Sequence, residues 1–533
     1  MEKAKSEALK AFSKVDPFTL SEKAPGKMYN LVDGKWKETK DYRWVIDPMN
    51  GEKFLQMPNT NDEELKEFAE SLRKVPKTGL HNPLKNVQRY VMYGEICRKA
   101  SELLNQEDVV AHFVKLIQRF VPKHASQAFG EVKLVRSFLA NFSGDNVRFL
   151  AQAVAYPGDH DGQNPTGYRW PLGAVAVISP FNFPLEIPSM QVMGALFMGN
   201  KVIMKPNSKT TVVMDEFIRM LHYCGMPMSD CDLIHCAGDT FEHLYKMCPI
   251  RMTQFTGSTD IAEKLAVLTH GRVRLEDAGF DWKILGPDVA TMNLDYIAWQ
   301  CDQDAYALTG QKCSAQSFMM VHKSVSKTDF YEKLKVQAAK RNLADLSVGP
   351  VLSVKNKEFE AHRDFVMSLE GSKILFGGKA LSTPNKIPAC YGTWEPSAYL
   401  VPLKHFQDPK AFPKLIQEVF GPVQIVTEYD DSELDTVLDL LERIPLHLTA
   451  AVVSNDAVFR HKVLGHTVNG TTYAGYRART TGAPQNHWFG PAGDIRAAGI
   501  GTPESIKLVW SVHREVVYDD QPEPKDWTMP KPT

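Results

Sequence analysis

The sequence lacks paired cysteines, a net charge and any long uninterrupted apolar run. Its eight cysteines include no Cys-x-x-Cys pair and no zinc-type spacing, which fits free thiols in a reducing compartment better than a disulfide framework. The formal net charge is −1, so no global field draws the chain to nucleic acid or to an anionic membrane. We therefore expect no resident metal, no nucleic-acid partner and no membrane insertion.

Two targeting signals are also missing. The longest apolar stretch, residues 173–198, is interrupted by Asn182, Glu186, Gln191 and three prolines, so it does not predict a transmembrane helix. Residues 1–27 mix lysine with acidic residues, whereas a mitochondrial transit peptide is rich in arginine and nearly free of acids. Either the protein stays where it is made or the given chain lacks its presequence.

The length of 533 residues predicts about three domains with a sizeable core. Residues 1–60 suggest a loosely packed arm, and residues 62–142 predict helices because apolar residues recur every three or four positions. Residues 147–170 predict an extended hairpin with strands at 147–151 and 166–170. Such a hairpin is either a surface loop or an oligomerisation flap.

Residues 173–276 alternate between short β-branched runs and helical runs. The predicted strands are 174–178, 202–205, 233–236, 252–255 and 273–276, with helices between them. Repeated β-α units of this length indicate a parallel sheet covered by helices on both faces, in which ligands bind beyond the carboxyl ends of the strands. Residues 284–473 repeat the alternation and predict a second α/β domain.

Cys313 follows a glycine turn between a predicted helix, 294–307, and a predicted strand, 318–322. At the mouth of a cleft, backbone N–H groups directed at such a thiol would favour the nucleophilic thiolate. Taken alone, a cysteine in a protein of this kind is more often a small buried apolar residue.

Polar residues follow the predicted strands of the first domain. Asn182 stands between two prolines, where its amide could stabilise an oxyanion or simply satisfy its own turn. Lys205 could hold ribose hydroxyls or a phosphate, or be a solvated strand end. Residues 256–259 form a glycine turn before a helix, which suits a pyrophosphate but is a weak signal without a full Gly-x-Gly-x-x-Gly pattern.

Two carboxylates have similar alternatives. Glu276 ends a strand, where it could act as a general base for water or face solvent. Glu418 and Phe420 precede a strand; they could meet a ribose and a flat ring, or be a solvated carboxylate beside a core aromatic.

Together these segments resemble the aldehyde dehydrogenase superfamily. Six motifs occur in the order and spacing of that family: residues 180–184 (PFNFP), 205–206 (KP), 255–258 (FTGS), Glu276, 310–313 (GQKC) and 418–422 (EVFGP). Within the superfamily, residues 79–83, 274–283, 299–306 and 486–494 are most similar to the plant-type Δ1-pyrroline-5-carboxylate dehydrogenases, family twelve.

The resemblance implies an α/β fold with a Rossmann-like NAD-binding domain, an α/β catalytic domain and a β-hairpin oligomerisation flap. The implied division is residues 1–150 and 171–283 for NAD binding, 284–480 for catalysis, and 151–170 with 481–533 for the flap, anchor loop and tail. It also implies a homo-oligomer in the mitochondrial matrix.

The implied reaction is the NAD-dependent oxidation of L-glutamate γ-semialdehyde, the open form of pyrroline-5-carboxylate, to L-glutamate in proline catabolism. Cys313 would be the nucleophile, Glu276 the base for water and Asn182 the oxyanion donor. The residues implied in NAD binding are Ser179, Pro180, Lys205, Asn207, Ser208, Gly257, Ser258, Thr259, Glu418 and Phe420. Those implied in substrate binding are Phe183, Ser314, Gly482, Ala483 and Phe489.

Three departures from the family pattern bear on this interpretation. Ser208 stands where most NAD-preferring members have glutamate, so preference over NADP is not secured. Ala483 lacks the hydroxyl of the usual Gly-Ser anchor, so Arg477 and Arg479 could pair with the α-carboxylate or lie in a solvated loop. Asp277 could perturb the pKa of Glu276 or point to solvent.

Three rival functions stay open: an aldehyde dehydrogenase for another small aldehyde, a cysteine acyl hydrolase or acyltransferase that needs no NAD, and a binding protein without turnover. The intact set of Cys313, Glu276 and Asn182 argues against the last of these, and Gly257, Ser258, Glu418 and Phe420 argue against the second.

Overall fold

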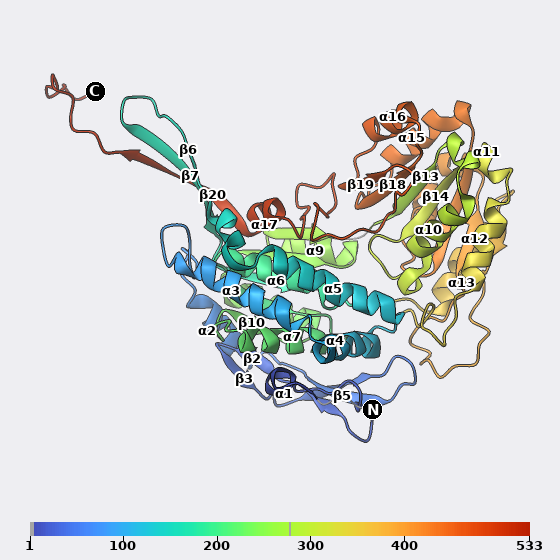
Figure 1. Ribbon diagram of the computed structural model, residues 1–533, viewed down its shortest axis with the longest axis horizontal. Coiled ribbons are helices and arrows are strands. Elements are labelled where there is room, and N and C mark those ends of the chain that lie inside the picture. The colour runs from blue at the N-terminus through green and yellow to red at the C-terminus, as the bar shows by residue number, and fades with distance from the viewer. Residues whose placement is uncertain (1–4, 277–278) are drawn as a thin grey trace.

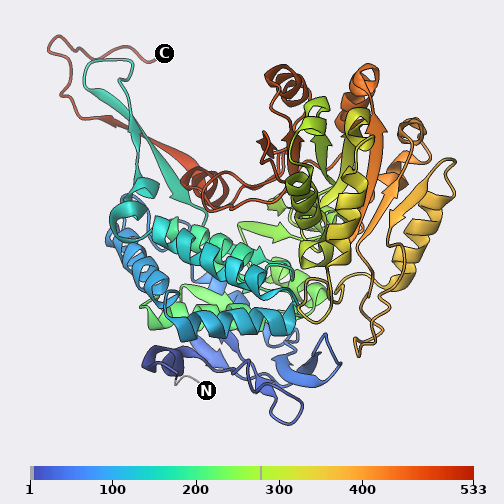
Figure 2. The same ribbon diagram turned by 45° about the vertical axis from the view of Figure 1, so that its right-hand side comes forward.

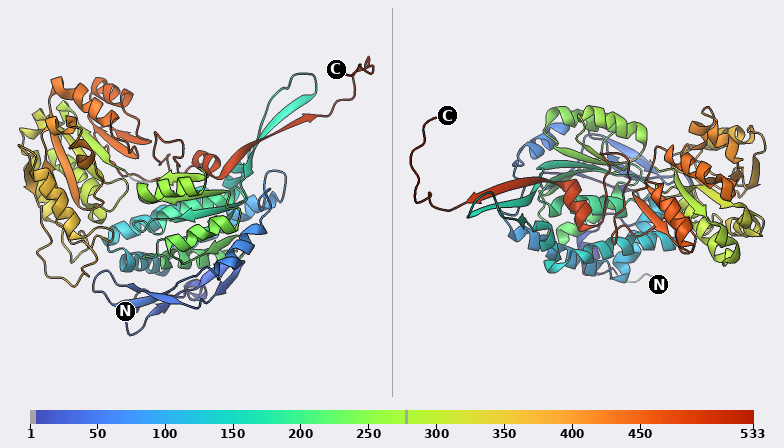
Figure 3. Two further views of the ribbon diagram at one scale, coloured as in Figure 1. Left: turned by 180° about the vertical axis from the view of Figure 1, so that it is seen from behind. Right: turned by 90° about the horizontal axis from the view of Figure 1, so that it is seen from above.

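A computed structural model describes residues 5–276 and 279–533, and within them the strands form two seven-stranded sheets and two three-stranded sheets (Figure 1). The two large sheets belong to separate lobes that lie side by side, and a narrow arm projects from the first lobe away from the second (Figure 3). In the described part of the chain, no helix combines the length and apolar character needed to cross a bilayer.

The first lobe contains a sheet with the strand order β12-β11-β8-β9-β10-β2-β3. The first five of these strands run parallel, as the β-α alternation predicts, and β2 and β3 add antiparallel neighbours at one edge. Their bounds are β2 Asn30–Val32, β3 Lys35–Lys37, β8 Ala174–Ile178, β9 Lys201–Lys205, β10 Cys231–Leu233, β11 Met252–Thr256 and β12 Val273–Glu276.

Alternate side chains of β8 enter two different cores, because successive residues of a strand point to opposite faces of the sheet. Val175 and Val177 pack with one set of helices, while Ala174 and Ala176 pack with another. On the first face lie α3 Gln88–Leu103, α4 Glu107–Phe120, α5 Ala125–Asn141, α6 Glu186–Phe197, α7 Val212–Tyr223 and α17 Pro503–Trp510. On the second lie α2 Leu65–Arg73 and α8 Gly238–Met247, and α9 Thr259–Leu268 packs on β11 and β12.

The first sixty residues are not a loosely packed arm, so that prediction is wrong. Helix α1 Glu7–Phe12 buries Leu9 and Phe12 in the main core, and Leu31 of β2 joins them. A separate small sheet has the order β1-β5-β4, with bounds β1 Gly26–Lys27, β4 Tyr42–Ile46 and β5 Lys53–Pro58. This segment forms the lower layer of the first lobe (Figure 2).

The second lobe contains a sheet with the order β15-β16-β17-β14-β13-β18-β19, parallel except for β15. Its inner strand β13, between β14 and β18, was not predicted. The bounds are β13 Asp281–Leu285, β14 Gln316–His322, β15 Lys373–Phe376, β16 Ser397–Leu400, β17 Val423–Tyr429, β18 Thr449–Val453 and β19 Thr471–Ala474. Its helices are α10 Leu294–Tyr306, α11 Lys323–Ser326, α12 Phe330–Ala339, α13 Asn356–Met367, α14 Phe412–Leu415, α15 Leu434–Glu442 and α16 Ala457–Gly465.

The projecting arm is a three-stranded antiparallel sheet of β6 Val154–Ala155, β7 Gln163–Pro171 and β20 Ser511–Asp519 (Figure 2). The main partner of β7 is therefore the C-terminal strand β20, which pairs with it over nine residues. Residues 147–151 were predicted as a strand, and that prediction is wrong: Gly144–Ala151 is the 3-10 helix η1. Val147 and Leu150 are three positions apart, and both are buried on one side of it.

Candidate active site

The site forms where the carboxyl edge of the first sheet faces the turn that carries Cys313. In the register of the first sheet, Lys205 is the partner of Ile178, and Thr256 is the partner of Glu276. These strands therefore end at one edge. Cys313 precedes β14 and Glu418 precedes its neighbour β17, so both lie at the amino edge of the second sheet.

The Cys313 turn is built from three consecutive residues in the left-handed region. The φ angles are 57° at Leu308, 54° at Thr309 and 70° at Gly310. A Cβ atom at Gly310 would lie 2.0 Å from the carbonyl oxygen of Gly421, so only glycine allows this close approach. The turn thereby brings the thiol next to the segment that carries Glu418 and Phe420.

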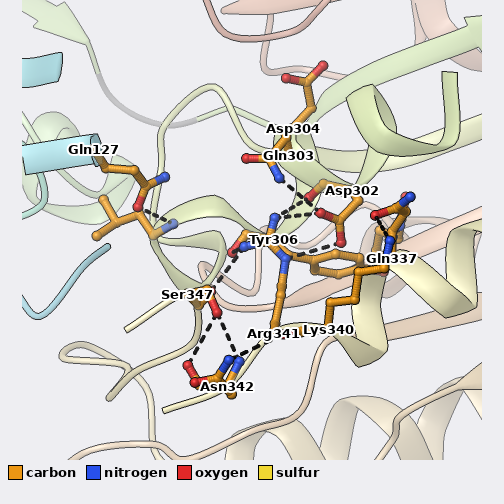
Figure 4. A network of polar contacts seen from close by, with 12 residues as sticks. Gln127, Asp302, Gln303, Asp304, Tyr306, Gln337, Lys340, Arg341, Asn342 and Ser347 are labelled. Atoms are coloured by element: carbon orange, nitrogen blue, oxygen red, sulfur yellow. Dashed lines mark hydrogen bonds and ion pairs between the residues drawn. The ribbon is translucent and has the colours of Figure 1, made fainter. Parts of the chain in front are cut away.

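A polar network fixes the end of α10 just before this turn (Figure 4). The Arg341 guanidinium donates two hydrogen bonds to the Asp302 carboxylate, at 3.1 and 2.6 Å, and one to the carbonyl of Tyr306 at 3.3 Å. Gln127 of α5 accepts a hydrogen bond from the N–H of Leu308 at 3.1 Å, which ties the turn to the first lobe.

The Cys313 thiol is half-buried and lies beside Glu276, whose side chain is buried at the end of β12. Burial, the negative charge of Glu276 and a hydrogen bond from the thiol to that carboxylate raise the pKa of Cys313 well above its usual range. In this arrangement the resting thiol is neutral. The thiol therefore becomes nucleophilic only when its proton leaves.

One cavity of about 580 Å³ joins these groups. All three catalytic candidates, Cys313, Glu276 and Asn182, line it. So do nine of the ten cofactor candidates: Ser179, Pro180, Lys205, Asn207, Ser208, Gly257, Ser258, Glu418 and Phe420. The tenth, Thr259, is the first residue of α9 and does not line the cavity.

The end of the cavity away from Cys313 suits a dinucleotide phosphate. Ser258 is the N-cap of α9, so the N–H groups of the first turn point toward the cavity edge, where the helix dipole favours an anion. Lys205 also reaches this surface, and burial lowers its pKa. The residues at this end therefore fit a nicotinamide dinucleotide.

The lining residues that were not predicted include Lys209, Glu242, Ser353 and Val354. Lys209 lies 5.6 Å from the centre of the Phe181 ring, and burial lowers its pKa. Ser353 and Val354 lie in the loop before α13, which has no motif that would single it out. Of these four residues, Lys209 alone could have been identified from the sequence, because it lies four residues after Lys205.

The substrate-binding candidates lie outside the lining of this cavity. The Ser314 hydroxyl lies 3.1 Å from the Thr481 hydroxyl, which joins the cysteine turn to the loop that carries Gly482 and Ala483. A Cβ at Gly482 would lie 1.9 Å from the Tyr473 hydroxyl. Phe183 belongs to a small cluster with Leu308 and Phe420, and Phe489 is buried in the core of the first lobe.

The anchor loop is tied to a buried carboxylate. Asp304 accepts hydrogen bonds from the Arg479 Nε at 2.9 Å, the Thr480 N–H at 3.0 Å and the Lys283 Nζ at 2.7 Å. Arg479 is therefore engaged in an internal ion pair. Lys312 donates to the Thr481 hydroxyl at 3.1 Å, and burial lowers the pKa of this lysine to about 7.

Two further predictions concern the residue Asp277 and a resident metal. The suggested effect of Asp277 on Glu276 concerns a residue outside the described part of the chain. Across the residues whose placement is described, His, Cys, Asp and Glu side chains form no group of three able to hold a metal ion.

Comparison with known proteins agrees with the motifs and the fold. A model of the aldehyde dehydrogenase family matches residues 36–507. The chain is 52% identical over 523 residues to "Delta-1-pyrroline-5-carboxylate dehydrogenase 12A1, mitochondrial" of Arabidopsis thaliana, an alignment that covers 98% of this chain and 94% of the relative. It is also 52% identical over 522 residues to a "Probable aldehyde dehydrogenase" of Linum usitatissimum, with the same coverage of 98% and 94%.

Solved structures share the whole fold at low sequence identity. An NAD-dependent aldehyde dehydrogenase from Sinorhizobium meliloti superimposes with a TM-score of 0.80 at 19% identity, covering 97% of this chain and 100% of that one. PnpE in complex with nicotinamide adenine dinucleotide gives a TM-score of 0.79 at 19% identity, covering 93% and 98%. With the family model matching most of the sequence, this chain belongs to the aldehyde dehydrogenase family.

Proposed function

We propose that this protein oxidises L-glutamate γ-semialdehyde to L-glutamate with NAD, as a step of proline catabolism. The observation that carries aldehyde oxidation is the convergence of Cys313, Glu276 and Asn182 on one cavity with a dinucleotide-sized surface beside them. The choice of substrate is supported by 52% identity over nearly the whole chain to the Arabidopsis thaliana relative of that name.

The reaction follows from the three side chains. The Cys313 thiolate attacks the aldehyde carbon, and the Asn182 amide with the Cys313 N–H stabilises the resulting oxyanion. NAD held in the cavity would supply the acceptor for the hydride that this carbon loses. Loss of the hydride leaves a thioester between this carbon and Cys313. Glu276 then takes a proton from a water molecule as its oxygen attacks the thioester, and glutamate and the free thiol are released.

NAD would extend from Cys313 toward α9. Lys205, Asn207 and Ser208 would hold the adenosine ribose, and Gly257, Ser258 and Thr259 the pyrophosphate. Glu418 would bind the nicotinamide ribose, with Phe420 beside the ring. Ser179 and Pro180 would line the path between the two ends. Because Ser208 carries no charge, it neither attracts nor repels a 2′-phosphate, so NADP is a competing cofactor to test.

The amino-acid end of the substrate would meet the anchor loop. Phe183 and Phe489 would flank the aldehyde, and Ser314 would lie beside the nucleophile. Gly482 and Ala483 would bind the α-carboxylate through backbone N–H groups.

The proposed domains are residues 1–150 and 171–283 for NAD, 284–480 for catalysis, and 151–170 with 481–533 for the flap, anchor loop and tail. The proposed compartment is the mitochondrial matrix, which the relative's name supports. The flap leaves Val154, Val512 and Val517 exposed. We therefore propose that it joins a second copy in a homo-oligomer, and gel filtration with light scattering that finds only a monomer would contradict this.

The deciding assay follows NADH absorbance after addition of pyrroline-5-carboxylate. It is repeated with other small aldehydes and with NADP. A higher kcat/KM for another aldehyde would replace the substrate. Ester or thioester hydrolysis without any NADH formation would favour the cysteine acyl hydrolase.

A further inference from the structure

A buried ion pair lies behind the turn that carries Asn182. The Lys123 Nζ and Glu131 Oε2 atoms are 3.0 Å apart, and both side chains are 0% exposed. Lys123 precedes α5, and Glu131 lies on the buried face of that helix. Removing two charges from water is unfavourable unless hydrogen bonds compensate for the lost hydration, so the other contacts of the pair need explanation.

Those contacts go to the turn between β8 and α6. The Lys123 ammonium donates a hydrogen bond to the carbonyl oxygen of Asn182 at 2.8 Å. The Glu131 Oε1 atom accepts hydrogen bonds from the N–H groups of Leu185 at 2.8 Å and Glu186 at 3.0 Å. The pair therefore holds the turn at both ends: Lys123 binds the Asn182 carbonyl, Glu131 binds the N–H groups of Leu185 and Glu186, and the ion pair links these hydrogen bonds.

The turn has limited means to hold itself. Pro180 and Pro184 have no N–H group, so neither can donate a backbone hydrogen bond. The Asn182 side chain is 2% exposed and lines the cavity, and its Oδ1 atom accepts no hydrogen bond from the residues that the structure describes. Lys123 and Glu131 thus hold the backbone from which the Asn182 amide projects.

We propose that Lys123 and Glu131 are positioning residues that hold the Asn182 amide in place for the oxyanion formed at Cys313. This rests on the proposed function only in that Asn182 stabilises an oxyanion. A donor that is held in advance needs no rearrangement when charge develops, which is the source of its effect on the rate. A pair that served folding alone would change stability and leave the contribution of Asn182 intact.

The test is a double-mutant cycle between the pair and Asn182. Lys123→Met with Glu131→Gln removes both charges at similar side-chain size, so no lone charge remains buried. The glutamine still accepts from the two N–H groups, whereas methionine cannot donate to the Asn182 carbonyl. Asn182→Ala is introduced into the wild type and into this pair variant.

Two readouts are taken for each variant. The first is kcat for the semialdehyde with NAD. The second is hydrolysis of p-nitrophenyl acetate without NAD, in which Cys313 displaces p-nitrophenolate through a tetrahedral oxyanion and water then releases acetate. The ester needs the same amide but no cofactor and no particular aldehyde. Ester hydrolysis therefore tests whether the pair positions the Asn182 amide even if the proposed aldehyde substrate is wrong.

We expect Asn182→Ala to lower both rates roughly 10²- to 10³-fold in the wild type, the effect of removing one oxyanion donor. The pair variant should lose roughly 10- to 100-fold in kcat with KM nearly unchanged. Adding Asn182→Ala to the pair variant should then bring the total loss only to that of Asn182→Ala alone, an added cost of about tenfold instead of 10²- to 10³-fold, because interacting residues give non-additive effects. Full additivity, or wild-type rates in the pair variant, would overturn the proposal.

A matched control is the ion pair of Lys201 and Asp232, at 3.4 Å with side chains 4% and 0% exposed, which does not line the cavity. Lys201→Met with Asp232→Asn should lower the melting temperature and keep both rates. Should the first pair variant not purify, Glu131→Asp, which keeps both charges and shortens the reach of the carboxylate, replaces it in the cycle. Its smaller loss must again be non-additive with Asn182→Ala, and an additive loss would refute the inference equally.

Discussion

Replacing Glu276 with glutamine should separate the two halves of the reaction. The side chain is buried at the end of β12, and its carboxylate accepts a hydrogen bond from the Cys313 thiol. Glutamine keeps the size and removes the charge and the basicity. Hydride transfer from the Cys313 adduct does not involve water. Hydrolysis of the thioester requires a base that removes a proton from the attacking water, so only this hydrolysis should slow.

A general base contributes roughly 10²- to 10⁴-fold to a rate, or about 3–5 kcal/mol of the barrier. Steady-state kcat of Glu276→Gln should therefore fall by that factor. Stopped-flow mixing of enzyme and NAD with pyrroline-5-carboxylate should still give a rapid burst of about one NADH per active site, followed by almost no turnover.

The same change should make the thiol more reactive at low pH. The charge of Glu276 and its hydrogen bond are among the causes that raise the pKa of Cys313, after burial, and Glu276→Gln removes both. The thiolate fraction grows as pH rises through the thiol pKa, so lowering that pKa moves the rise to lower pH. Iodoacetamide should alkylate Cys313 faster in Glu276→Gln than in the wild type at neutral pH, measured by mass spectrometry.

Glu263→Gln is the matched control, because Glu263 is a carboxylate on α9 paired with Arg496 at the surface. It should leave the burst, kcat and alkylation unchanged. The reasoning fails if Glu276→Gln keeps wild-type kcat, or if the burst disappears while Cys313 is alkylated as fast as or faster than in the wild type.

The remaining predictions concern the nucleophile, the cofactor and the anchor loop. Cys313→Ser should abolish NADH formation with an unchanged melting temperature, and near-normal turnover would remove the assignment. Ser208→Glu should raise KM for NADP at least about tenfold, or about 1.4 kcal/mol, because the new carboxylate repels the 2′-phosphate, and should change KM for NAD little. If the KM values for NADP and NAD rise equally, the ribose 2′-position of the cofactor does not lie beside residue 208. Asp304→Ala should destabilise the fold by about 3–5 kcal/mol in denaturant titrations, because it leaves Lys283 buried and uncompensated. Burial opposes the ionisation of Asp304, but Lys283 and Arg479 outweigh it and lower its pKa, so this stabilisation is complete above the unfolded pKa and is lost as pH falls; equal acid sensitivity of wild type and Asp304→Asn would contradict this.

The sequence predicted which residues end the strands at one sheet edge more closely than it predicted the elements around them, and the difference has a physical cause. Lys205 and Glu276 end strands of one parallel sheet, and Asn182 and Gly257 follow its other strands, so a correct strand assignment places all four at one edge. β13 was missed because its sequence, DWKIL, places Asp281 and Lys283 at fully buried positions. The burial of these two side chains is compensated by long-range polar partners, Asp304 for Lys283 and the Thr449 N–H for Asp281, which local periodicity does not contain.

The N-terminal segment was misjudged for a related reason. α1 has six residues and β1 has two, which is too short for a periodic pattern to emerge, yet Leu9 and Phe12 enter the core. Residues 147–151 carry apolar positions that satisfy both a strand and a 3-10 helix. Contact of η1 with α3 decides between them.

Local sequence patterns also explain why Asn182 was predicted as a site residue whereas Lys123 and Glu131 were not. Lys123 and Glu131 are charged residues in a helical region, where charge ordinarily marks a solvated face. Their function depends on meeting residues 182–186, more than fifty positions later in the chain. A motif such as PFNFP records what must touch the substrate. What makes Asn182 effective is a backbone held by two buried charges, and that is visible only once α5 is packed against the start of α6.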